Sequence, residues 1–203
     1  MDLTAAMMNV SLLWILTTPH EFAHAWVATR LGDDTPRREG RVTLNPLAHV
    51  DWLGTVFLPA ITSLLGAGFL GWGKPVNTNP YQLRWGMKGL ALVALAGPAS
   101  NVVFTVVLAA AAVFTRNLLP PFAAYAAKGA RLSLYLAIFN MAPVPPLDGS
   151  KLLLAAKVPA VVYNELARFG FLLLIVAMSA SNLGVWMSAW SWNGTQKIID
   201  LFL

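Results

Sequence analysis

Cysteine is absent from the 203-residue sequence, and charged residues make up only 11% of it. Without cysteine there is no disulfide framework and no thiolate metal site, so any metal ligands must be histidines or carboxylates. Soluble domains contain roughly 25% charged residues, so the low charge and the 57% hydrophobic content predict a polytopic membrane protein. No polar stretch approaches the roughly 50 residues of a soluble regulatory domain. We therefore expect one membrane-embedded domain over residues 1–203.

Long apolar segments predict an all-α fold with about five to six transmembrane helices. The first segment is long enough to cross about 30 Å of hydrocarbon at about 1.5 Å per residue. The predicted membrane segments are residues 3–31, 52–72, 90–114, 132–158 and 161–186, and residues 190–203 are predicted to form an interfacial tail. The net charge of +5 is expected to place basic loops against anionic lipid headgroups, because the sequence contains no nucleic-acid-binding module.

Three ionisable residues, His20, Glu21 and His24, interrupt the first apolar segment. The two histidines are four residues apart, so on a helix both imidazoles lie on one face and can bind a single cation, with Glu21 beside them. H-E-x-x-H on a helix is the signature of zinc metalloproteases, in which the carboxylate accepts a proton from water. The alternative is a pair of polar core residues on a soluble helix. We favour the metal site because unpaired ionisable groups at membrane depth are costly.

A proline-rich break precedes Asp148. The prolines at positions 143, 145 and 146 cannot continue a regular helix, and non-helical backbone at membrane depth persists only where protein or a water cavity satisfies it. Asp148 is therefore the candidate for a third metal ligand. It could also cap a helix over residues 149–158, a position that aspartate favours, and the two roles are compatible.

Asn101 lies near the start of the third apolar segment, after Gly97, Ala99 and Ser100. The small residues are explained by close packing between helices. A primary amide at that depth needs a hydrogen-bond partner, which is either another helix or the backbone of a substrate.

The connection after the first segment is predicted to contain a short β-like, re-entrant segment followed by a turn at residues 45–46. This segment comprises Val42, Thr43 and Leu44. His49 has two possible roles: an imidazole near the metal and the substrate, or a loop imidazole bonded near Asp51. We favour the second.

The motif His20-Glu21-x-x-His24, followed much later by Asn140-x-x-Pro143 and by Asp148-Gly149, resembles the site-2 protease family of intramembrane zinc metalloproteases. Further similarity lies at residues 40–46, 54–55, 73–76 and 97–101. These motifs are typical of the compact bacterial and archaeal branch, which lacks the PDZ and cystathionine-synthase-type domains of other branches.

The resemblance implies one Zn²⁺ ion held by His20, His24 and Asp148, with Glu21 as general base and acid. It also implies that Asn140 stabilises the oxyanion or holds the substrate. Two imidazoles and one carboxylate leave a fourth tetrahedral position open, as in catalytic rather than structural zinc sites.

The implied substrate is a transmembrane helix of another protein, which must unwind before cleavage. Asn101 is expected to contact it, and residues 42–44 could pair with it as an added strand. The resemblance implies a multi-pass protein of a prokaryotic cell (inner) membrane. The distribution of basic residues favours an orientation with the active site nearer the cytoplasmic side.

Two other functions use similar residues. Histidine, aspartate and broken helices also build ion pathways, so a divalent-metal transporter or sensor is one alternative. A membrane zinc hydrolase acting on lipid amides is another. The convergence of the candidate ligands in one motif and one distant aspartate favours a hydrolase over a transporter.

Overall fold

The computed structural model describes residues 3–64 and 71–203, and within these ranges the chain is helical and contains no strand. The long helices are α1 (Leu3–Arg30), α4 (Met87–Thr115), α5 (Pro120–Asn140), α7 (Ala160–Ala180) and α8 (Leu183–Asp200). The short elements are α2 (Thr35–Arg38), a 3₁₀ turn η1 (Pro46–His49), a π-helical turn η2 (Trp52–Phe57), α3 (Leu58–Leu64) and α6 (Gly149–Ala155).

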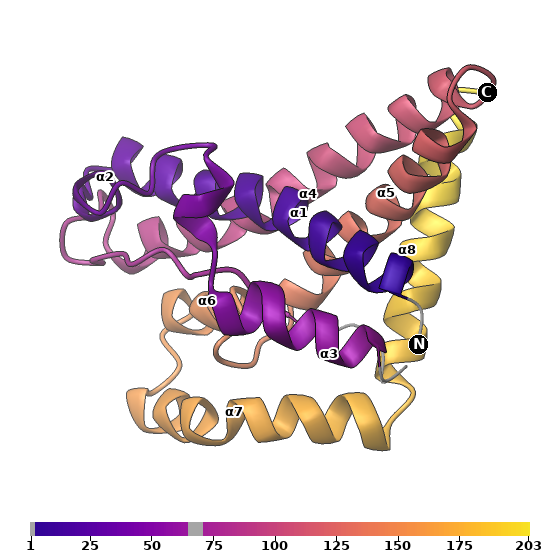
Figure 1. Ribbon diagram of the computed structural model, residues 1–203. Coiled ribbons are helices and arrows are strands. Elements are labelled where there is room, and N and C mark those ends of the chain that lie inside the picture. Colours follow the sequence, from indigo (N-terminus) through magenta and orange to yellow (C-terminus); the bar gives the residue numbers. More distant parts are fainter. Residues whose placement is uncertain (1–2, 65–70) are drawn as a thin grey trace.

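Helices α1, α4 and α5 form the packed centre of the molecule, with α8 against α5 and α4 (Figure 1). Small residues occupy the contacts between these helices, so the backbones approach closely. Buried alanines on these helices include Ala25 and Ala28 of α1, Ala94 and Ala109 of α4, and Ala126 and Ala130 of α5. In Figure 1, α7 runs along the bottom of the view, with α3 and α6 between it and α1.

Helix α1 continues through Pro19, which lacks an N–H group to bond the preceding turn. The hydroxyls of Thr17 and Thr18 donate to the carbonyls of Leu13 and Trp14, at 2.8 and 2.7 Å. These carbonyls lie in the turn before the proline, whereas the carbonyl that loses its backbone donor at Pro19 is that of Ile15, four residues earlier. The helix nevertheless continues through the proline and carries the H-E-x-x-H motif into the centre of the molecule.

Two helices of the described residues are long and apolar enough to cross a membrane: α4, and the Ala160–Met178 part of α7. They indicate a membrane protein, but the predicted five to six crossings are not confirmed. The described residues of the predicted segment 52–72 form the turn η2 and helix α3 up to Leu64, and residues 71–72 are not helical. Residues 65–70 of that segment lie outside the described residues.

The predicted membrane segment 132–158 begins inside α5, which starts at Pro120 and includes Arg131. The Arg131 guanidinium donates to the hydroxyl of Ser188 at 2.8 Å and lies 5.1 Å from the ring centre of Trp192. Its charge is thus accommodated beside α8 and does not end the helix. Residues 190–200 of the predicted interfacial tail form part of helix α8, which buries Ser191 and Thr195.

The predicted β-like segment after the first helix is not found. Val42 and Thr43 lie in bends, and the Thr43 hydroxyl accepts the N–H of Asn45 at 3.1 Å. The imidazole of His49 donates to the Thr43 carbonyl at 2.8 Å. These local bonds fold the chain back on itself and use a backbone carbonyl that a strand would offer to a partner.

Candidate metal centre

His20, His24 and Asp148 converge although Asp148 is more than a hundred residues away along the chain. Nε2 of His20 and Nε2 of His24 lie 3.1 Å apart, and Oδ2 of Asp148 lies 3.1 Å from the first and 3.0 Å from the second. All three side chains are buried. Three atoms with lone pairs directed at one point repel each other unless a cation or a proton lies between them.

The orientation of His24 is set by the main chain of α4. Its Nδ1 lies 2.6 Å from the carbonyl oxygen of Val93. A carbonyl can only accept, so Nδ1 carries the proton and Nε2 presents a lone pair to the centre. Histidines that bind metals are typically oriented by a second hydrogen bond of this kind.

The two carboxylate oxygens of Asp148 have different partners. Oδ2 faces the two histidines, whereas Oδ1 lies 3.0 Å from Nζ of Lys151. Asp148 occupies the N-cap position of α6 but makes no capping hydrogen bond, so its side chain is committed to the histidines and the lysine. The break that carries it, residues 141–148, lies between α5 and α6 as predicted.

Gly97 of α4 lies directly against the imidazoles. A Cβ atom at this position would lie 2.3 Å from Nε2 of His24 and 2.6 Å from Nε2 of His20. Both distances are far shorter than an ordinary van der Waals contact of 3.4–4 Å, so any side chain here would overlap the imidazoles. The missing side chain therefore leaves space for an ion at the point to which both nitrogens are directed.

The residues fit a zinc ion. Tetrahedral zinc with bonds of about 2.0–2.2 Å holds its ligand atoms about 3.3–3.6 Å apart, so the separations of 3.0–3.1 Å found here need only a small outward movement to admit the ion. Two imidazoles and one carboxylate are also the ligand set of catalytic zinc sites that keep one position open. His20, His24 and Asp148 are thus the candidate metal ligands of the described residues.

Glu21 is held by a backbone group from a distant part of the chain. Its Oε2 accepts the N–H of Val76 at 3.1 Å. Val76 belongs to a non-helical stretch, residues 71–79, which we call the 71–79 segment. The side chain of Glu21 is buried and faces the same cavity as the three candidate ligands.

That cavity has a volume of about 420 Å³. Six of the residues predicted to form the site line it together: His20, Glu21, His24, Asn101, Asn140 and Asp148. Apolar side chains complete the wall, among them Leu13 of α1, Phe139 of α5 and Phe171 of α7. The cavity thus combines a small polar centre with a largely apolar lining, as ligand sites commonly do.

The two asparagines differ in how their amides are used. Nδ2 of Asn140 donates to the carbonyl of Leu136 at 3.0 Å, so one of its two N–H groups stays free for another acceptor. Asn101 is fully buried, and neither Oδ1 nor Nδ2 has a hydrogen-bond partner within the described parts of the chain. Burying an amide without a partner costs about 1–3 kcal/mol.

Other predicted residues lie away from this centre. Val42, Thr43 and Leu44 are not among the residues that line the cavity, and Leu44 is exposed. His49 is buried in the loop, and its partner is the Thr43 carbonyl rather than Asp51. Burial lowers the pKa of His49 and outweighs the hydrogen bond to Thr43, which raises it; the charge of Arg41 lowers it further.

Three contributors were not predicted from the sequence. Gly97 was explained by helix packing, although it precedes Pro98 and Asn101 in the motif at 97–101. The role of the Val76 N–H cannot be predicted from the sequence, because it is a backbone group that does not depend on the side chain. Lys151 had a detectable signal, because its position three residues after Asp148 places it on the same face of the following helix.

Comparisons with known proteins agree with this geometry. The chain is 35% identical over 173 residues to "Putative zinc metalloprotease YwhC" of Bacillus subtilis, a match that covers 78% of this chain and 74% of that protein. It is 32% identical over 175 residues to "Putative zinc metalloprotease Rip2" of Mycolicibacterium smegmatis, which covers 82% of this chain and 64% of the relative. A Rip2 protein of Mycobacterium tuberculosis is 35% identical over 136 residues, 64% of this chain and 49% of its own.

No family model matches the chain, and no solved structure matches it. The curated relatives nevertheless align with most of its length, and the two with the longest alignments are both named as zinc metalloproteases. Similarity of this extent shows that the chain belongs to the site-2 protease family of zinc metalloproteases.

Proposed function

We propose that the chain is a zinc-dependent endopeptidase with one metal ion, and that it cleaves peptide bonds within or near transmembrane helices of other proteins. One observation carries the proposal: the carboxylate of Glu21 faces the cavity into which His20, His24 and Asp148 also converge. A metal transporter needs the converging ligands but has no use for an adjacent carboxylate held as a proton acceptor.

The chemistry divides between the metal and the side chains. Zinc in such a site acidifies water and polarises the carbonyl of the scissile bond. Glu21 accepts the proton of the attacking water and passes it to the leaving amine. The free N–H of Asn140 is available for the oxyanion, a contribution of about 3 kcal/mol in other hydrolases.

Asn101 supports a peptide substrate. A primary amide with an unpaired donor and an unpaired acceptor is complementary to one peptide group of an extended chain, which offers a carbonyl and an N–H. A transmembrane helix uses both groups internally, so it must unwind at the bond to be cut. Substrate residues that break helices are expected to assist cleavage.

The apolar wall supports a substrate that comes from the membrane. Phe171 and Leu174, which line the cavity, belong to α7, one of the two helices apolar enough to cross a bilayer. We propose a multi-pass protein of a prokaryotic cell membrane, with the active site nearer the cytoplasmic face.

The test combines metal analysis with cleavage of a single-span substrate by purified wild type and Glu21→Gln. We expect the variant to keep its zinc and to lose turnover. A ceramide-like lipid assayed in parallel should remain intact. Full turnover by Glu21→Gln, or hydrolysis of the lipid but not of the peptide, would overturn the proposal.

A further inference from the structure

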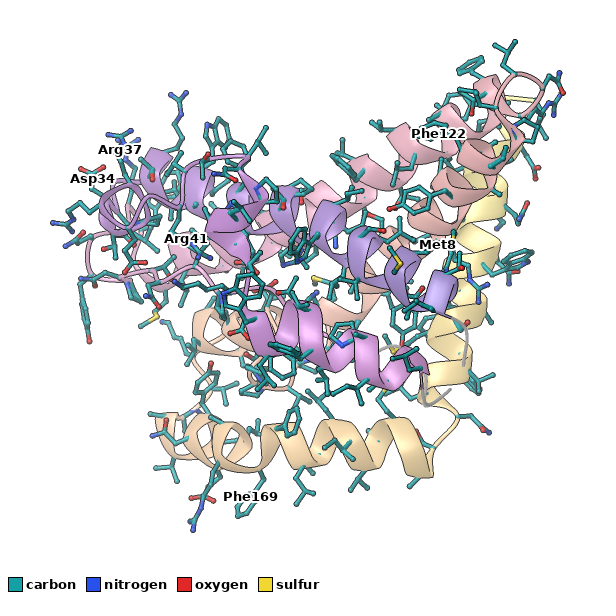
Figure 2. The ribbon with its side chains drawn as sticks, viewed as in Figure 1. Met8, Asp34, Arg37, Arg41, Phe122 and Phe169 are labelled. Carbon is teal, nitrogen blue, oxygen red and sulfur yellow. The ribbon has the colours of Figure 1, made fainter. Side chains whose placement is uncertain are left out.

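Arg41 is a buried cation outside the candidate metal centre. Its side chain belongs to the connection between α2 and η1, and the residue is only 3% exposed. Figure 2 shows Asp34 and Arg37 at the outer edge of the molecule, whereas Arg41 lies further inward. Among the described residues no carboxylate lies within ion-pair distance of it. Burying a guanidinium without an ion pair costs several kcal/mol, so its position calls for a specific role.

The guanidinium connects two loops through their backbone carbonyls. Nη1 donates to the carbonyl of Ala48 at 2.6 Å, and Nη2 donates to the carbonyl of Lys74. The N–H of Lys74 in turn donates to the carbonyl of His49 at 2.9 Å. Both backbone groups of Lys74 are therefore fixed relative to the loop that carries Arg41.

Lys74 lies two residues before Val76, whose N–H binds Glu21. The 71–79 segment is also held on either side of these residues. The Trp72 carbonyl accepts the hydroxyl of Thr55 at 2.8 Å, and the N–H of Asn79 donates to Asp33 at 2.6 Å. An extended segment has no internal hydrogen bonds, so these external contacts determine where the Val76 N–H points.

The charge of Glu21 also affects the pKa of Arg41. Burial lowers the pKa of Arg41, while the carboxylates of Glu21 and Glu39 act in the opposite direction. The guanidinium is therefore close enough to Glu21 to interact with it electrostatically, although it does not line the cavity.

We infer that Arg41 is a positioning residue for Glu21. The Arg41 guanidinium fixes Lys74 in the 71–79 segment, and this segment presents the Val76 N–H to the Glu21 carboxylate. The inference rests on the proposed function, in which Glu21 moves the proton. Lysine cannot replace Arg41, because a single ammonium does not span two carbonyls as a planar guanidinium does.

Loss of this positioning should lower kcat without affecting metal binding or substrate binding. Arg41→Met and Arg41→Lys are expected to retain one zinc per chain and to keep KM within about twofold of wild type. Their kcat should fall by roughly 10- to 100-fold, the effect of a catalytic group displaced by about 1 Å. Arg38→Met removes an exposed arginine at the end of α2, three residues before Arg41, and should leave kcat, KM and zinc content unchanged.

A second pair of variants directly tests the hydrogen bond between the Val76 N–H and Glu21. Val76→Pro removes the N–H that binds Glu21, and Val76→Ala keeps it as the reference. We expect Val76→Pro to lower kcat well below Val76→Ala. The double variant Arg41→Met/Val76→Pro should be no slower than the slower single variant, because both changes break one chain of contacts.

The outcomes distinguish this inference from the proposed function. Normal kcat in both Arg41 variants, multiplicative losses in the double variant, or loss of zinc in a folded Arg41 variant would overturn the positioning role while leaving the proposed function intact. If Arg41→Met does not fold, Arg41→Lys and the Val76 pair decide the question. Failure of the proposed function would appear instead as unchanged turnover in Glu21→Gln.

Discussion

Gly97 and His24 touch so closely that a Cβ atom on the glycine would lie 2.3 Å from Nε2 of the histidine. Gly97→Ala should therefore place a methyl group where the metal binds. We expect the variant to lose zinc and all cleavage activity, with zinc content measured on the purified protein. Relief of the clash by movement of α4 would also displace the Val93 carbonyl that orients His24.

Gly129→Ala is the matched control. It lies on a neighbouring helix of the same core, but its Cβ would meet only the flexible ends of Leu12 and Leu108, at 3.0 and 3.2 Å. This variant should keep its zinc. Equal zinc binding by both variants would show that the space beside Gly97 is not needed for the ion.

Asn101→Leu should separate stability from function. Its amide is buried with both polar atoms unpaired, so an apolar side chain of similar size should leave thermal stability unchanged or raise it by up to about 3 kcal/mol. The kcat/KM for a peptide substrate should fall because the binding partner of the peptide group is lost.

Thr105→Val, on the same helix, should have the opposite effects on stability and on activity. The Thr105 hydroxyl donates to the Asn101 carbonyl at 2.8 Å, away from the cavity lining. The variant should lose about 1 kcal/mol of stability and none of its activity. If Asn101→Leu instead destabilises the protein without affecting cleavage, the amide has a structural partner.

Asp33 and Asp34 are adjacent but should respond very differently to mutation. Asp33 is fully buried, and its carboxylate accepts the N–H groups of Thr35 and Asn79 at 2.9 and 2.6 Å. Asp33→Ala should lower thermal stability by about 3 kcal/mol, since hydrogen bonds to charged groups are worth about 1.5–3 kcal/mol each. The exposed Asp34 pairs with Arg37 at 3.4 Å, so Asp34→Ala should cost less than about 1 kcal/mol.

His49 should make stability depend on pH. Its pKa lies below the ordinary value of 6.5 because the ring is buried, so in acid the unfolded chain binds the proton first. Its contribution to stability is therefore complete above about pH 6.5 and is lost as the pH falls from there through the folded-state pKa. The slope is at most about 1.4 kcal/mol per pH unit.

The measurement compares thermal unfolding of wild type and His49→Gln at pH 7.5 and pH 5.5, both values chosen about one unit from the ordinary pKa. The other titrating groups are common to both proteins, so the difference isolates His49. Wild type should lose more stability than the variant on acidification. Identical losses would show that His49 is readily protonated in the folded state.

The candidate site was predictable because each of its two motifs can be identified from neighbouring residues in the sequence. The four-residue spacing of His20 and His24 needs only a helix, and the prolines before Asp148 mark a break without any knowledge of the fold. The link between Arg41 and Glu21 was not predictable, because it passes through backbone groups of Lys74 and Val76. Backbone donors are the same at every residue other than proline, so the sequence contains no sign of which one is used.

Segment bounds were harder to predict than the candidate site. A membrane segment was predicted from residue 132, whereas α5 begins at Pro120, and Arg131 contacts Ser188 and Trp192 of α8 inside this continuous helix. The β-branched residues at 42–43 suggested a strand, but the His49 imidazole binds the Thr43 carbonyl. A tertiary contact in the first case and a hydrogen bond within the loop in the second outweighed a local preference.

The bond between Lys151 and Asp148 bears on which ions the protein accepts. With Oδ1 engaged by the ammonium group, the aspartate offers a metal one oxygen rather than two. Calcium needs six to eight oxygen donors and magnesium prefers an octahedron of oxygens, whereas a pair of nitrogens and a single oxygen suit a small, borderline cation. By occupying Oδ1 of Asp148, Lys151 is expected to favour such a cation over calcium and magnesium.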